Sequence, residues 1–246
     1  MKLINMIGLN QVPNRGLVCS YDIGNTLSYP GTGTAISDLN KTVGNLTIAG
    51  SPVYSTGNWG YLTLTQSSSP QYAGNNSASY IPGATNSVSV GIMFNSTSNG
   101  AGQNRVVFSY YGGNTVGKSD ITLYLDTTGA LMFYVRDGSA TGNTMIFVTT
   151  TTTYNDGNWH YAVFVINQVG KSASFYIDGA FAGTASNSSW AGFAYVSSNI
   201  FGMGGDSVNT PQYFIGKISV CHYHFVALTA EEITQSWSYL IKRTLH

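Results

Sequence analysis

The sequence has 246 residues, of which 43% are hydrophobic and only 8% are charged, against roughly 25% charged residues in an average soluble protein. Lysine plus arginine and aspartate plus glutamate count ten each, so the formal net charge is zero. No basic stripe is present to neutralise phosphates, which excludes a nucleic-acid binder, and no run of about 18 apolar residues predicts insertion into a membrane. The length fits one β-sandwich domain.

Residues 1–15 are predicted to form an N-terminal arm that precedes a domain over residues 16–246. The apolar stretch of the arm is short and polar-interrupted, so we expect no secretory signal. Extended, about fourteen residues would reach roughly 45 Å, enough to cross to a neighbouring subunit, although the arm folding back on its own domain is the alternative. The apolar anchors expected for assembly are Leu3, Ile4, Met6, Ile7 and Leu9.

Short β-rich runs separated by turn residues predict an all-β domain. They lie at 17–21, 61–65, 87–94, 105–111, 121–126, 131–136, 145–150, 160–167, 173–178, 193–201 and 213–224. Glycine with Asn or Asp separates many of them, and even spacing of this kind is typical of a sandwich. Clean alternation in 123–125 and 175–177 indicates antiparallel sheets with one buried face. Residues 67–86, rich in Ser, Gly and Asn, are predicted to be irregular.

One helix is predicted at the C-terminal end. Thr229 and Glu232 have the spacing of a capping box. Apolar residues then recur at helical spacing and predict a stripe that lies on the sandwich: Ile233, Trp237, Leu240 and Ile241.

The run DGNWH at 156–160, followed by SFYIDG at 174–179, resembles the signature of laminin-G-like and pentraxin-like domains of the concanavalin A fold. Residues 213–218 and 228–233 resemble the last core strand of that family and its exit into a helix. The resemblance implies a two-sheet antiparallel jelly-roll sandwich, concanavalin A-like or laminin G-like, with a short C-terminal helix and an N-terminal arm. Trp159, Phe164, Phe175 and Ile177 are then expected in its hydrophobic interior.

Residues 16–39 are similar to the opening of lectin-like domains in structural proteins of phages and large viruses. This similarity, with no secretion signal, implies a virion protein made in a host cytoplasm: a capsid-decoration, minor capsid or tail-associated subunit. Its partners would be other virion subunits, in a homo- or hetero-oligomer. The alternative is a glycan-binding adhesin that attaches to host-surface glycans.

Catalysis is not expected. Glycoside hydrolysis needs two carboxyl groups about 5–9 Å apart, and the only glutamates, Glu231 and Glu232, both fall in the first turn of the helix. His222 and His224 share one face of a strand, and we interpret them as residues at its solvated edge, although their spacing also suits a metal.

Candidate carbohydrate-binding residues are aromatics flanked by glycine, serine or asparagine: Trp59, Tyr110, Tyr111, Trp190 and Tyr213. The same residue types also suit protein interfaces or core packing. No cofactor is expected. Relatives of this fold bind calcium at a rim, which makes the loop residues Asp137 and Asp206 candidate calcium ligands, with turn formation as the alternative.

The two cysteines, Cys19 and Cys221, fall in strand-like runs and do not have the spacing of a metal site. In this fold the first and last long strands often neighbour each other. We nevertheless expect both thiols to stay reduced, because a cytoplasmically assembled protein meets no oxidising compartment.

Overall fold

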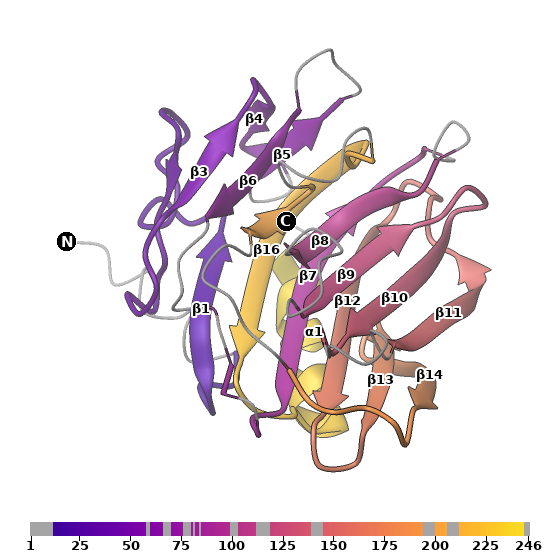
Figure 1. Ribbon diagram of the computed structural model, residues 1–246. Coiled ribbons are helices and arrows are strands. Elements are labelled where there is room, and N and C mark those ends of the chain that lie inside the picture. Colours follow the sequence, from indigo (N-terminus) through magenta and orange to yellow (C-terminus); the bar gives the residue numbers. More distant parts are fainter. Residues whose placement is uncertain are drawn as a thin grey trace.

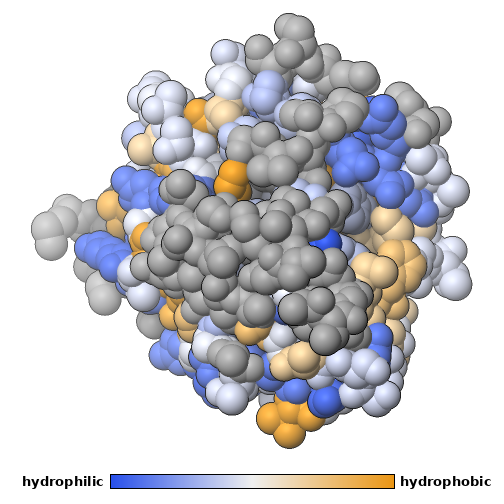
Figure 2. Space-filling view, viewed as in Figure 1, coloured by the Kyte–Doolittle hydropathy of each residue, from blue (hydrophilic) through white to orange (hydrophobic). Residues whose placement is uncertain are grey.

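The computed structural model describes residues 12–57, 60–65, 70–75, 80, 82–83, 85–98, 103–111, 119–138, 145–193, 200–205 and 212–243. Two antiparallel sheets pack face to face, and helix α1 (Ala230–Arg243) lies on the far side of one of them (Figure 1). This is the predicted two-sheet sandwich. On the face of the molecule that Figure 2 shows, hydrophilic and hydrophobic residues are interspersed among the described residues. The predicted anchors at positions 3 to 9 lie outside the described residues. Within the described ranges, no helix has the length and apolar character needed to cross a membrane.

Sheet A contains the first and the last strand of the domain, β1 and β16. Its order is β14-β13-β12-β7-β16-β5-β4, with β1 also paired to β16. The strands are β1 (Leu17–Asp22), β4 (Val53–Ser55), β5 (Tyr61–Leu64), β7 (Val88–Asn95), β12 (Trp159–Asn167), β13 (Ser172–Ile177), β14 (Ala180–Ser186) and β16 (Gly216–His224). The two halves of β16 pair with β1 and β5 along one edge, while β7 runs along the other.

Sheet B has the order β11-β10-β9-β8-β15-β6-β3-β2. Its strands are β2 (Ala35–Ile36), β3 (Leu46–Ala49), β6 (Tyr72–Asn75), β8 (Arg105–Tyr111), β9 (Asp120–Leu125), β10 (Ala130–Arg136), β11 (Met145–Thr153) and β15 (Ile200–Met203). Strands β8 to β11 follow one another along the chain as a meander. The other half is assembled from strands far apart in sequence, and in Figure 1 the indigo β3 lies in the same sheet as the salmon β11.

Three details of the strand layout correct the sequence-based prediction. Strand β6 lies inside residues 67–86, which were predicted to be irregular; its one inward-facing apolar residue is Ala73, so its composition does not show a strand. Strand β15 covers Ile200–Met203 and so extends past the run predicted at 193–201, of which residues 194–199 lie outside the described residues. Strand β16 begins at Gly216, because Tyr213 instead forms an isolated parallel bridge with Val106.

The main core lies between the sheets. Phe164 of β12 and Phe133 of β10 stack across it with ring centroids 4.4 Å apart. Phe175 and Ile177 belong to the same buried cluster, because residues two apart on a strand share a face. The interior positions predicted for Phe164, Phe175 and Ile177 are confirmed.

The prediction for Trp159 is wrong, because its side chain lies in a second apolar cluster between sheet A and helix α1. Trp159 is five residues from Phe164, and an odd separation on one strand places two side chains on opposite faces. Tyr161, Val163 and Val165 point the same way as Trp159 and contact the cluster that contains Ile233 of the helix. The strand is therefore covered on both faces.

Helix α1 is tied to the start of the domain at both its ends. The predicted capping box forms: Thr229 N donates to Glu232 Oε2 at 2.8 Å, and Glu232 N donates to Thr229 Oγ1 at 3.3 Å. Arg15 donates to the same Glu232 at 2.6 Å. At the other end, Arg243 donates to both carboxylate oxygens of Asp22 on β1, at 2.7 and 3.1 Å.

The two cysteines lie on neighbouring strands, as diagonal positions of the β1–β16 pair. Both thiols are free and buried. Burial raises the pKa of Cys19 and of Cys221, so neither thiol forms the reactive thiolate readily.

His222 and His224 are not at a solvated edge, which corrects the interpretation from sequence. Both are buried beneath the helix side of sheet A. His224 Nδ1 lies 3.1 Å from the Arg15 carbonyl, and the Tyr161 hydroxyl lies 3.3 Å from His222 Nδ1. Burial lowers the pKa of His222 to about 3 and that of His224 to about 4. Both imidazoles are therefore neutral at physiological pH.

The signature residues at 156–160 and 174–179 form a brace at one rim of the sandwich. The two ring nitrogens of His160 lie 2.8 Å from Asp178 Oδ2 and 3.0 Å from Asp156 Oδ1. Asp178 Oδ1 also accepts from Tyr161 N at 2.8 Å. The Asp178–Gly179 turn then contacts the helix, because Thr234 Oγ1 donates to the Gly179 carbonyl at 3.0 Å. The signature thus has a structural role, in holding β12, β13 and α1 together.

Candidate functional site

A groove on the outer face of sheet B crosses β3, β6 and β15. We call it the Tyr72 groove; its volume is about 300 Å³, and it is lined by Thr47, Ala49, Tyr72, Gly74, Asn75 and Ile200. Strand register produces this grouping, since Ala49 pairs with Tyr72 and Thr47 pairs with Gly74. Paired residues of antiparallel strands present their side chains on the same face.

Gly74 lies in the floor of the Tyr72 groove. Gly74 of β6 pairs with Gly202 of β15. A Cβ at Gly74 would lie 3.0 Å from the Tyr72 ring and 3.0 Å from the Phe201 carbonyl, so a larger residue would displace the ring. Glycine in a strand often marks such a close approach. Gly74 therefore lets the Tyr72 ring lie against the sheet.

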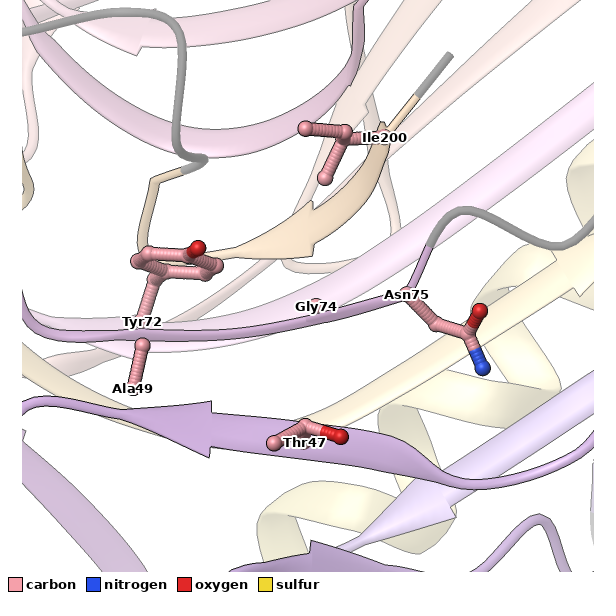
Figure 3. Close-up of a pocket in the computed structure, with 6 residues that line it drawn as sticks. All are labelled: Thr47, Ala49, Tyr72, Gly74, Asn75 and Ile200. Carbon is pink, nitrogen blue, oxygen red and sulfur yellow. The ribbon is translucent and has the colours of Figure 1, made fainter. Parts of the chain in front are cut away.

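The groove has an aromatic end and a polar side (Figure 3). Tyr72 and Ala49 lie together at one end, Thr47 lies beside Gly74, and Asn75 lies at the other end. Asn75 Nδ2 donates to the Asn45 carbonyl at 2.6 Å, which fixes the orientation of the amide. An aromatic face beside hydroxyl and amide groups can stack on a flat apolar surface and hydrogen-bond at its edge, as small-ligand sites commonly do.

Polar residues continue along the outer face of sheet B beyond the groove. Ser109 of β8 pairs with Thr122 of β9, and both are buried. Their hydroxyl groups have no hydrogen-bond partner among the described residues. Next to them, Arg136 forms a buried ion pair with Asp120. Burial lowers the pKa of Arg136.

Three of the predicted carbohydrate-binding residues are buried. Tyr110 and Trp190 are each 1% exposed, and Tyr111 is also buried. Trp190 Nε1 donates to Gln168 Oε1 at 3.0 Å and its ring packs against Phe193 at 5.3 Å. Tyr110 and Trp190 belong to the main core, which is the core-packing alternative that the sequence left open for them. Tyr111 lies on the opposite face of β8 from Tyr110.

Of the other two aromatics, Tyr213 is half-buried beside Gly205, whose Cβ would lie 3.0 Å from its ring. It sits near the Tyr72 groove, because a Cβ at Gly205 would also lie 3.6 Å from Tyr72 Cβ. Trp59 lies outside the described residues.

The structure describes only one of the two candidate calcium ligands, Asp137. Asp137 is buried, and its Oδ2 accepts a hydrogen bond from Ala191 N at 3.0 Å, which is a loop-holding role. Asp206 lies outside the described residues. Within the part of the chain that the structure describes, no three His, Cys, Asp or Glu side chains group as metal ligands.

The described aspartates hold the fold together. Their partners are Arg243 for Asp22, backbone amides for Asp38, Arg136 for Asp120, the turn residues Thr128 and Ala130 for Asp126, Ala191 for Asp137, and His160 for both Asp156 and Asp178. Glu232 binds Arg15. A hydrolytic pair needs carboxyl groups that face the substrate, whereas these carboxylates are directed at loops and strands.

The fold is a lectin-like sandwich of the jelly-roll class. Residues 67–234 match the concanavalin A-like lectin/glucanases superfamily, and this match covers more than half of the chain. The chain therefore belongs to that superfamily, as the motifs at 156–160 and 174–179 predict. A comparison with curated proteins finds no match.

Several solved structures share the sandwich. The binding domain of Paraclostridial Mosquitocidal Protein 1 superimposes with a TM-score of 0.68 at 16% identity, over 91% of this chain and 52% of that one. Domain 4 of AbnA, a GH43 extracellular arabinanase from Geobacillus stearothermophilus solved in complex with arabinotriose, gives 0.63 at 17%, over 89% and 97%. The Ruminococcus gnavus IT-sialidase CBM40 gives 0.56 at 13%, over 71% and 94%. The chain thus spans about half of the mosquitocidal protein's solved chain. At these identities the likeness shows the fold alone.

Proposed function

We propose that this chain is a carbohydrate-binding module that holds its ligand in the Tyr72 groove and catalyses no reaction. The observation that carries the proposal is the half-buried Tyr72 ring, which lies against a glycine of the floor, beside the Thr47 hydroxyl and the Asn75 amide. A sugar ring has apolar C–H faces and a hydroxyl edge, and these two features match an aromatic face flanked by polar groups.

Two of the compared structures support this choice of ligand class. One is an arabinanase domain solved with arabinotriose, and the other is a module of a sialidase. Their ligands are theirs, and a shared fold leaves the chemistry of a site open. They support the proposal because the same sandwich, of similar length, serves as a separate domain in carbohydrate-active enzymes.

The test is a glycan array probed with the whole chain, with and without calcium, followed by affinity measurements on the best ligand. Tyr72→Ala should lower the affinity about tenfold, because covering roughly 60 Å² of apolar ring face with a sugar contributes about 1.5 kcal/mol at about 25 cal/mol per Å². Tyr72→Phe should keep most of the affinity, because the aromatic ring remains. Phe147→Ala is the matched control, since Phe147 is an aromatic residue, 50% exposed, at the opposite edge of sheet B. A blank array, or equal binding by Tyr72→Ala, would overturn the proposal.

We propose as a second candidate that the chain is a subunit of a virus particle, joined to other subunits through the arm. The supporting observation is the root of the arm: Val12 is buried, and Arg15 binds both Glu232 and the Ala227 carbonyl. The part of the arm that the structure describes, from Val12 to Arg15, is thus held against the domain. Deleting residues 2–11 should leave a folded domain that no longer joins a particle, and normal incorporation of that deletion would contradict this role.

A further inference from the structure

A second hollow lies on the opposite face of the molecule, between sheet A and helix α1. We call it the Trp237 pocket; its volume is about 490 Å³, and the residues used below are Asn95, Trp159, Asp178, Lys217, Trp237 and Ile241. It does not overlap the Tyr72 groove, which lies on the outer face of sheet B.

The floor of the Trp237 pocket is one row of residues across three neighbouring strands. Trp159 of β12 pairs with Asn95 of β7, and Asn95 pairs in turn with Lys217 of β16. Because paired residues share a face, all three side chains project toward the helix side of sheet A. Asn95 is buried, and its Nδ2 donates to the Gly157 carbonyl, which holds the rim loop against the floor.

The wall of the pocket is the second half of helix α1. Trp237 and Ile241 are one turn apart on the helix and are both half-buried. Trp237 is held in place by the Asp178–Gly179 turn, since a Cβ at Gly179 would lie 3.1 Å from Trp237 Cδ1. The indole therefore stands against a fixed turn, and its position does not depend on a ligand.

Aromatic rings and one lysine define the ligand chemistry. The rings of Trp159 and Tyr61 lie with centroids 5.6 Å apart, and Lys217 Nζ lies 5.1 Å from the Tyr61 centroid. This cation–π contact positions the ammonium group beside the aromatic surface. Among the described residues, Lys217 forms no ion pair with a carboxylate.

The carboxylate of the pocket is already engaged. Both oxygens of Asp178 have partners, in the amide of Tyr161 and the ring of His160. The imidazole of His160 contacts Asp156 as well. Asp178 therefore offers little to an incoming cation or sugar hydroxyl, whereas the Lys217 ammonium has no anionic partner in the part of the chain that the structure describes.

We propose that the Trp237 pocket binds an acidic saccharide, with a pyranose ring against the indoles of Trp159 and Trp237 and its acid group on Lys217. This site goes beyond the proposed function, because it uses a different face, different residues and a charged ligand. A carboxylate or a sulfate could supply the acid group, since a lysine ammonium pairs with either. The size of the pocket is that of a typical small-ligand site.

The experiment is a titration of the whole chain, followed by backbone NMR and calorimetry, with trimers of galacturonic, glucuronic and mannuronic acid. A neutral galactose trimer and its sulfated form are the comparison ligands. At least one acidic trimer should shift signals of Trp159, Trp237 and Lys217 and bind about tenfold more tightly than the neutral trimer. Its affinity should fall as salt is added. Comparing the uronic acid trimers with the sulfated galactose trimer shows whether the site prefers a carboxylate or a sulfate.

Variants separate this site from the groove. Lys217→Met should remove the preference for the acidic over the neutral trimer, Lys217→Arg should restore much of it, and Trp237→Ala should weaken both ligands. Tyr72→Ala should leave acidic binding unchanged, so the pocket and the groove can fail independently. Native-like NMR spectra of each variant check folding. The proposal is overturned if no acidic trimer shifts the pocket signals at millimolar concentration, if neutral and acidic trimers bind equally, or if Lys217→Met binds as the unchanged chain does.

Discussion

His160 Nδ1 lies 2.8 Å from Asp178 Oδ2, and this contact joins the start of β12 to the turn after β13. The other ring nitrogen lies 3.0 Å from Asp156 Oδ1. A carboxylate is an acceptor only, so an imidazole between two carboxylates is satisfied when both its nitrogens carry protons. The brace is therefore an imidazolium between two anions.

The pH dependence of stability tests this brace. Burial by itself would lower the pKa of His160, but the hydrogen bonds and charges of Asp178 and Asp156 outweigh burial and raise it above the ordinary value of 6.5. A raised pKa contributes stability that is complete below 6.5 and is lost as the pH rises through the value in the folded protein. His160→Gln should remove this contribution.

The measurement for the brace is urea unfolding from pH 5 to 9 on the unchanged chain and on His160→Gln. The difference in free energy of unfolding between the two should be largest at the acidic end and shrink as the pH rises above about 6.5. Taking the difference cancels the opposite effect of the buried neutral His222 and His224. A difference that stays constant or grows with pH would show that His160 is not held as an imidazolium.

Core packing gives a second prediction. Phe164 stacks on Phe133 across the sheets, so Phe164→Ala should cost about 3–5 kcal/mol of unfolding free energy through lost burial and an unfilled cavity. Phe181→Ala removes the same side chain where it is 59% exposed and should cost less than about 1 kcal/mol. Denaturant unfolding of the two variants measures both losses of unfolding free energy. Equal losses would mean that the sandwich interior is not where the stability resides.

The capping box at the start of helix α1 gives a third prediction. Thr229→Ala leaves the Glu232 amide without its acceptor and should lower the free energy of unfolding by about 1 kcal/mol. Thr229→Ser keeps an oxygen at the same position and should retain most of the stability. Thermal unfolding of the three proteins provides the comparison. An alanine variant as stable as the unchanged chain would rule out a stabilising cap.

The thiols give a fourth prediction, which also tests the expectation that they stay reduced. Cys19 and Cys221 are buried, and burial raises the pKa of each. Neither should react with a thiol reagent such as dithionitrobenzoate in the folded protein, and both should react after unfolding in guanidinium without reductant. No reaction after unfolding, with an intact mass lower by two hydrogens, would demonstrate a disulfide instead.

Local sequence pattern was sufficient to predict the regular parts of the fold. In β9 and β13, apolar residues alternate with polar or half-exposed ones, so the strands and their inner faces could be assigned. Thr229 and Glu232 predicted the helix start because a capping box is complete within four residues. Alternation was less informative for β12, because both faces of this strand are covered and apolar residues occur on each. Trp159 was therefore assigned to the wrong face of the strand.

The candidate sites depend on long-range pairing, which no local pattern contains. Tyr72 lines a groove only because β6 pairs with β3 and β15, strands that come from distant parts of the chain. The feature of the sequence that could have indicated β6 is the order of its residues. The larger side chains of Tyr72 and Asn75 flank two small residues, Ala73 and Gly74. Glycine and serine neighbours made Tyr110 and Tyr111 candidates for sugar stacking, yet every residue of β8 is buried.

The most direct test of the central claim is where a sugar binds. The best ligand from the glycan array is titrated into isotope-labelled protein, and backbone amide shifts are followed residue by residue. Binding at the Tyr72 groove predicts the largest shifts at Thr47, Tyr72, Gly74 and Ile200, and their loss in Tyr72→Ala. Saturable binding whose shifts leave β3, β6 and β15 unchanged would contradict the claim.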